Sequence, residues 1–171
     1  MKKLLFFTLV GVVIAAGLTL SFTPAAQGDN GTTKISGIAY FAEGDECSEP
    51  PEGPDGALGV LASHMTGSLN GCLYSYTLSF EETPGGIYQE EGVNIYVGGG
   101  SEGDDGTFGA SYRFVAKFDE EGNELWGRCF HPITEGSGTG DYEGVTGRFN
   151  IRDNVDADPM ELHYKGHLRI P

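Results

Sequence analysis

The side chains of this 171-residue sequence that could do acid or base chemistry are few and isolated. His131 directly precedes Pro132, near a glycine-rich segment, so it is a candidate general base at the end of a strand. No nucleophile or carboxylate is paired with it in the sequence. His163 and His167 are four residues apart, about 13 Å along a strand, which is too far for one metal ion. His131 is therefore the one catalytic candidate.

Two acidic clusters carry oxygen atoms that could hold calcium. The clusters are Asp153, Asp156 and Asp158, and Glu102, Asp104 and Asp105. Neither has the spacing of a calcium loop, with its central glycine and terminal glutamate. We interpret both as solvated turns and expect no metal and no cofactor. The whole segment 98–106 is too polar to bury and is predicted to be exposed.

Three cysteines, Cys47, Cys72 and Cys129, predict one disulfide and one leftover thiol if the protein is exported. All three pairings remain open. A structural staple is the favoured interpretation, because the sequence contains no Cys-x-x-Cys pair that would indicate redox or zinc chemistry.

An aromatic face is the best candidate for a ligand cavity, since small-molecule sites are mainly apolar with a few hydroxyl groups. Its members are Tyr74, Tyr76, Phe80, Tyr112, Phe114 and Phe118. The alternative is that these rings simply fill the interior of the fold, because a small barrel is just wide enough for side chains or for one small ligand.

The elements that must position these residues are short strands separated by glycine, proline and acidic turns. Strands are predicted over 35–42, 72–80, 93–97, 108–118, 124–133, 145–152 and 161–170, and residues 58–68 fit either a helix or a strand. Seven or eight antiparallel strands form a sandwich or a closed barrel. Closure removes exposed sheet edges, so the prediction is an all-β, closed antiparallel barrel of about eight strands.

The N-terminal residues 1–26 have the pattern of a secretory signal peptide, with Lys2 and Lys3 ahead of an apolar run and small residues at the end. An uncleaved membrane anchor is the alternative. Residues 27–171 are then a single domain of a secreted or periplasmic protein with no stable membrane anchor.

The mature chain is strongly acidic. Lys2 and Lys3 leave with the signal peptide, so eight basic residues remain against 25 acidic ones, and the net charge is near −17. We expect no nucleic-acid partner, because phosphate binding needs a clustered positive field and this composition indicates none.

The C-terminal region carries a resemblance to a known family. The segment Gly138-Thr-Gly-Asp-Tyr-Glu-Gly-Val-Thr-Gly147, followed by a strand and by Leu162-His-Tyr-Lys-Gly166, resembles the C-terminal hairpin of the allene oxide cyclase and dirigent-protein barrels of the calycin-like group. Gly127-Arg-Cys-Phe-His-Pro132 is similar to secreted bacterial proteins of unassigned role with such a domain. The resemblance implies an eight-stranded barrel that can hold an apolar molecule, often in an oligomer. The cyclases' catalytic glutamate, proline and asparagine do not align with residues here, so neither activity transfers.

The functional expectation is a secreted β-barrel protein, with a homo-oligomer as an option, that binds a small apolar molecule in its barrel. The first alternative is an extracellular cyclase or isomerase, or a dirigent-like stereocontrol protein. The second alternative is a structural surface protein, which the acidity and glycine content favour.

Overall fold

The computed structural model describes residues 31–171, so the predicted signal peptide at 1–26 lies outside the described residues. Nine strands make up the regular structure of this range. No helix within residues 31–171 is long and apolar enough to cross a membrane.

The strands alternate with short turns along most of the chain. They are β1 (Thr32–Phe41), β2 (Gly59–Gly67), β3 (Gly71–Thr83), β4 (Ile87–Gly98), β5 (Gly106–Phe118), β6 (Glu124–Pro132), β7 (Thr139–Gly140), β8 (Thr146–Asn154) and β9 (Glu161–Arg169). The ambiguous segment 58–68 is thus a strand, and the predicted strand at 93–97 is part of a longer one.

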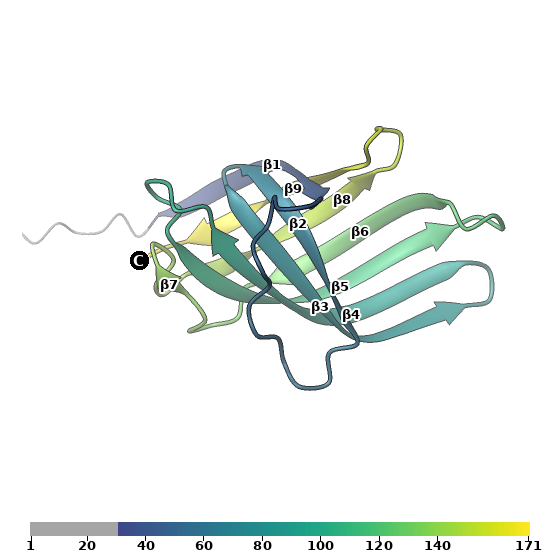
Figure 1. Ribbon diagram of the computed structural model, residues 1–171, viewed down its shortest axis with the longest axis horizontal. Coiled ribbons are helices and arrows are strands. Elements are labelled where there is room, and N and C mark those ends of the chain that lie inside the picture. The colour runs from purple at the N-terminus through teal and green to yellow at the C-terminus, as the bar shows by residue number, and fades with distance from the viewer. Residues whose placement is uncertain (1–30) are drawn as a thin grey trace, which may run out of the picture.

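Eight of the strands close into an antiparallel barrel (Figure 1). The sheet runs in the order β4-β3-β2-β1-β9-β8-β6-β5, and β4 also pairs with β5 over residues 87–97, which closes the ring. The predicted closed barrel is therefore confirmed. Strand β7 lies outside the ring and pairs only with the start of β5, at Gly106 and Thr107.

One end of the barrel lies near β7 and the C-terminus (Figure 1). We call it the closed end, because buried side chains fill its interior. Large side chains with less than 2% of their surface exposed pack there, among them Met65, Leu73, Tyr96, Phe108, Phe149 and Leu168. The rings of Tyr96 and Phe108 stack with centroids 4.8 Å apart. These residues alternate with outward-facing ones along each strand, as the period of two requires.

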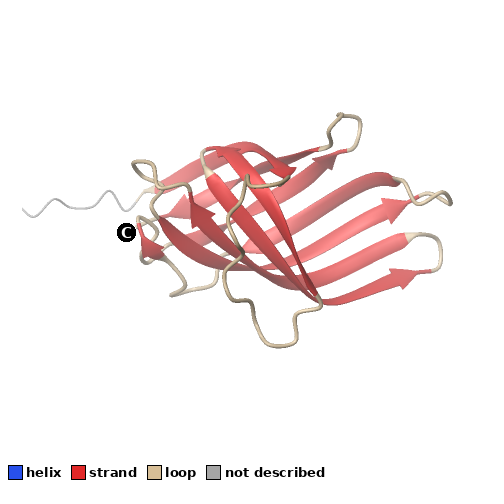
Figure 2. Ribbon diagram, viewed as in Figure 1, coloured by secondary structure: helices blue, strands red, loops and turns tan. Residues whose placement is uncertain are grey.

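The opposite end is wider, and we call it the flared end. Strand β2 stops pairing with β3 at Thr77, so the rest of β3, up to Thr83, pairs only with β4. Residues 124–127 of β6 likewise pair only with β5. The β3–β4 and β5–β6 hairpins consequently extend beyond the closed ring, as Figure 2 shows.

A loop joining β1 to β2 covers part of the outer wall of β3. A disulfide between Cys47 and Cys72 ties this loop to the strand, which settles the pairing that the sequence left open. Cys129 is the free cysteine. Tyr74 and Tyr76 are buried beneath the loop together with Cys72.

Candidate functional site

Four aromatic rings line the inner wall of the flared end. Tyr88 is their centre, with ring centroids 6.0 Å from Phe80 and 6.1 Å from both Phe114 and Phe118. Phe80 remains 62% exposed, because the hairpin that carries it has no strand across from it. The cluster is an apolar surface on the inside of the barrel that water can reach.

The six ring residues predicted as one face divide into two groups. Phe80, Tyr112, Phe114 and Phe118 face inward, whereas Tyr74 and Tyr76 face outward beneath the β1–β2 loop. The cause is a β-bulge at Leu78, where the β3–β4 register shifts between Thr77 and Ser79. One extra residue moves every following side chain to the other face, so a strict alternation from 74 to 80 does not hold.

The hydroxyl groups of Tyr74 and Tyr76 donate hydrogen bonds to the loop between β1 and β2. Tyr74 donates to the carbonyl oxygen of Ser48 at 2.9 Å, and Tyr76 donates to that of Pro51. Gly53 lies against the ring of Tyr76, where a Cβ atom would clash. These contacts give the two rings a structural role in holding the loop on the barrel.

A carboxylate stands behind the flared-end rings. Glu90 of β4 accepts hydrogen bonds from the hydroxyl groups of Tyr88, at 2.5 Å, and of Tyr112, and a third from Thr77 at 3.0 Å. Burial and the hydrogen bond to Glu90 raise the pKa of both tyrosines. Glu90 and these three hydroxyl groups thus place polar atoms beside the apolar surface of the rings. Sequence reasoning missed Tyr88 and Glu90, because segment 87–92 shows no clear alternation.

A second acidic pair lies on the β6 and β8 side of the flared end. The carboxyl groups of Glu124 and Asp153 meet over Gly127, and a Cβ atom at that glycine would clash with both. Burial, with the neighbouring Asp153 carboxyl as the next cause, raises the pKa of Glu124 to about 8, and burial also raises the pKa of Asp153. The pair therefore retains a proton near neutral pH, which makes it a hydrogen-bond donor as well as an acceptor.

His131 lies deeper in the barrel, at 2% exposure. Its ring stacks on Phe149 with centroids 4.4 Å apart and stands 6.1 Å from Tyr112. Burial lowers the pKa of His131 to about 3, so the imidazole is neutral at physiological pH. Among the described residues its Nδ1 atom has no hydrogen-bond partner. This packing resembles that of a core side chain more than that of a general base facing a substrate.

The free thiol of Cys129 faces the barrel interior between these groups. Burial raises its pKa, with Asp153 and Glu90 adding to the effect. A thiol held protonated in this way is a poor nucleophile, so Cys129 is not a catalytic candidate.

The closed end contains a buried carboxylate that sequence reasoning did not find. Asp104, predicted to lie in an exposed loop, is 5% exposed. Its Oδ1 atom accepts hydrogen bonds from Tyr96 and Tyr142, each at 2.5 Å, and its Oδ2 atom accepts one from the backbone N–H of Asn70 at 2.8 Å. The exposed-loop prediction is wrong at this residue, because three donors converge there and compensate for burial.

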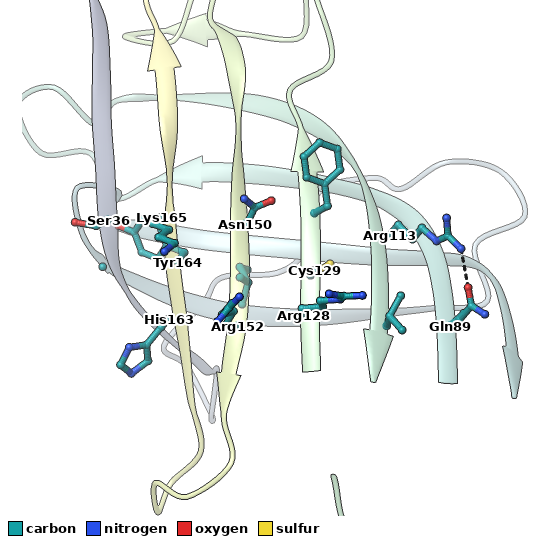
Figure 3. Close-up of a pocket in the computed structure, with 14 residues that line it drawn as sticks. Ser36, Gln89, Arg113, Arg128, Cys129, Asn150, Arg152, His163, Tyr164 and Lys165 are labelled. Carbon is teal, nitrogen blue, oxygen red and sulfur yellow. Dashed lines mark hydrogen bonds between the residues drawn. The ribbon is translucent and has the colours of Figure 1, made fainter. Parts of the chain in front are cut away.

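A groove of about 990 Å³ lies on the outside of the barrel, across β5, β6, β8 and β9 (Figure 3). Basic side chains surround it, namely Arg113, Arg128, Arg152, Lys165 and the imidazole of His163. None of the six predicted ring residues lines it. Basic side chains therefore do cluster on one part of this acidic chain, which its net charge does not reveal, and the absence of a nucleic-acid partner stays a prediction.

Comparisons with known proteins assign no family: no family model, no curated protein and no solved structure matches the chain significantly. The structure shows an eight-stranded antiparallel closed barrel. The likeness to allene oxide cyclase and dirigent barrels stays a resemblance of the residues quoted above.

Proposed function

We propose that the protein is an exported, non-catalytic binding protein that takes a small, mainly apolar molecule into the flared end of its barrel. The observation that carries this proposal is the ring cluster around Tyr88, which faces inward yet remains partly exposed. A barrel interior normally buries such rings against each other, as the closed end does. Apolar surface left open on a concave wall is typical of a ligand site.

The polar groups beside the rings define the kind of molecule. Glu90 with its tyrosines, and the adjacent carboxyls of Glu124 and Asp153, would orient a hydroxyl, carbonyl or amine at one end of the ligand. The rings Phe80, Phe114 and Phe118 would contact its apolar body. The Cys47–Cys72 disulfide supports export, since such bonds persist in oxidising compartments.

Uptake of Nile red, an uncharged dye, tests the proposal. An uncharged dye is needed because an anionic one would bind the basic groove outside the barrel. We expect saturable uptake with a blue-shifted emission, and at least fivefold weaker binding in Phe114→Ala. The control is Phe130→Ala, which makes the same substitution at a more exposed ring of the outer wall and should leave uptake unchanged. Absence of uptake, together with no apolar compound extracted from the purified protein, would contradict the proposal.

An extracellular cyclase or isomerase is the second candidate, and Glu124 is the observation that favours it. A carboxyl group with a pKa of about 8 can donate a proton at neutral pH. The enzyme hypothesis predicts that Glu124→Gln abolishes turnover of the extracted ligand while ligand binding persists. If the ligand is recovered unchanged after incubation with the wild-type protein, the enzyme hypothesis is contradicted and only the binding function remains.

A further inference from the structure

Every Lys and Arg of the described chain lies on one side of the barrel. We define the basic wall as the outward faces of β1, β9, β8, β6 and β5, which carry Lys34, Arg113, Lys117, Arg128, Arg148, Arg152, Lys165 and Arg169. These positions alternate with inward residues such as Ile35, Tyr112 and Tyr164. On the same five faces Glu161 is the single carboxylate among the described strand residues.

The sheet register places the cations beside one another. Arg128 is directly opposite Arg152, Arg152 is opposite His163, and Lys165 is opposite Asn150. Like charges directly opposite across a sheet destabilise it. The imidazole of His163 lies 2.6 Å from the carboxylate of Glu161, whereas Arg128 and Arg152 face each other with no carboxylate partner in residues 31–171. An anion bound from outside would relieve this repulsion.

The cations of the wall have few internal partners. Arg113 donates a hydrogen bond to Gln89, and Lys117 donates one to the carbonyl oxygen of Gly85. Within residues 31–171 the only Lys or Arg ion pair is Arg113 with Glu91, at 3.8 Å. The carboxylates gather elsewhere, for example on the β1–β2 loop at Glu43, Asp45, Glu46, Glu49, Glu52 and Asp55. The outward strand faces of the wall are therefore nearly free of carboxylates, although the β5–β6 turn beside them carries Asp119, Glu120 and Glu121. The guanidinium groups of Arg128, Arg148, Arg152 and Arg169 have no carboxylate partner within residues 31–171.

Two exposed aromatic side chains lie among the cations. The guanidinium of Arg128 stands 5.7 Å from the ring centroid of Trp126, and that of Arg148 stands 6.0 Å from Phe130. Trp126 is 40% and Phe130 is 43% exposed. The two rings hold the guanidinium groups in place for forked hydrogen bonds to oxyanions.

The size of the wall indicates a polymer. Five strands at about 4.8 Å spacing span about 20 Å, and the groove of about 990 Å³ lies within that span (Figure 3). A single small anion would meet only a fraction of the cations. A linear polymer with a charge on each unit would meet most of them.

We propose that the basic wall binds an acidic polysaccharide, a linear sugar polymer with carboxylate or sulfate groups on successive units. Guanidinium groups bind planar oxyanions in bidentate fashion, and the predicted export places the protein outside the cytoplasm, where such polymers occur. This binding is on the outer wall and does not depend on a ligand inside the barrel. A protein bound in this way would be held on a polysaccharide surface with the flared end of its barrel still accessible.

Binding to polygalacturonate, which carries carboxylates, and to heparin, which carries sulfates, tests the proposal, with neutral dextran as the control. We expect saturable binding to at least one acidic polymer and none to dextran. Raising the salt from about 50 to about 200 mM should weaken binding at least tenfold, because counterions are released from the polymer. The double variant Arg128→Gln/Arg152→Gln should bind at least tenfold more weakly, while Arg128→Lys/Arg152→Lys should keep most of the affinity.

The double variant should fold, because both side chains are exposed, and its denaturation midpoint should equal or exceed that of the wild type since a repulsion is removed. As a further control, Glu120→Gln/Glu121→Gln, in the β5–β6 turn, should not weaken binding. Three results would overturn the proposal. They are no binding to either acidic polymer at low salt, equal or tighter binding to a short single-stranded DNA, and salt-sensitive self-association that the double variant loses in the absence of polymer.

Discussion

At the closed end of the barrel Phe149 is fully buried, whereas at the flared end Phe80 keeps 62% of its surface exposed. Both rings face inward from strands of the same sheet. The difference arises from the number of strands around them, since a complete ring of eight surrounds Phe149 while the hairpins that carry Phe80 and Phe114 extend past their neighbours. The closed end thus supplies stability, and the flared end leaves apolar surface exposed.

The largest expected difference between the two ends is in the free energy of unfolding. Phe149→Ala should lower it by about 3–5 kcal/mol, because a large ring leaves a cavity in a filled core. Phe114→Ala should lower it by about 1–2 kcal/mol, because a half-buried ring loses less apolar contact. Urea unfolding followed by circular dichroism measures both. Equal losses would remove the distinction between the ends.

The Asp104 network gives the next largest effect. Asp104→Asn should cost about 1.5–3 kcal/mol, because an amide cannot accept from Tyr96, Tyr142 and the Asn70 N–H as a carboxylate does. The neighbouring Asp105→Asn, at an exposed side chain, should change the free energy of unfolding by about 0.5 kcal/mol or less. If both variants unfold at the same urea concentration, Asp104 does not hold the closed end together.

His131 should make the closed end sensitive to acid. Its pKa of about 3 in the folded protein lies below the ordinary value of 6.5, so the unfolded chain binds a proton first as the pH falls. Stability is then lost below about pH 6.5, at up to about 1.4 kcal/mol per pH unit. In His131→Phe, the difference in unfolding free energy between about pH 7 and about pH 4.5 should shrink. An unchanged difference would show that His131 is not buried as a neutral ring.

Glu124 should give the flared end the opposite and smaller response. Its folded pKa of about 8 lies above the ordinary value of 4.5, so its favourable contribution is complete below about pH 4.5 and is lost as the pH rises toward 8. Partial exposure weakens the effect through solvent screening. Glu124→Gln should flatten the decline in denaturation midpoint between about pH 6 and about pH 9, whereas Glu120→Gln in the adjacent turn should not.

The fold was largely predictable from sequence, because strands with one wet and one buried face show their alternation directly. Strand β9, with Leu162, Tyr164 and Leu168 inside, has this pattern over its whole length. The number of strands and the advantage of closure then led to the barrel. The strand at 58–68 was ambiguous because its apolar residues do not alternate strictly, and Leu58, Val60 and Leu61 remain exposed.

The candidate sites were predictable only in part, because they depend on which strands are neighbours. Alternation grouped Tyr74 with Phe80, and the bulge at Leu78, which separates them, has no clear signal in the sequence. The cations of β5, β6, β8 and β9 were visible as polar faces of separate strands. These faces form one basic wall only because β6 pairs with β8 and β8 pairs with β9 in the observed register. A single sequence does not reveal that pairing.

The unequal length of neighbouring strands has a consequence for how molecules of this protein meet. Past Thr77, one side of β3 presents amide and carbonyl groups to bulk water, and such an edge is a template on which another molecule can add a strand. Glu81 and Glu82 are exposed on this stretch, so two copies approaching side by side would bring four carboxylates together. This repulsion between like charges opposes the addition of a second molecule along the open edge.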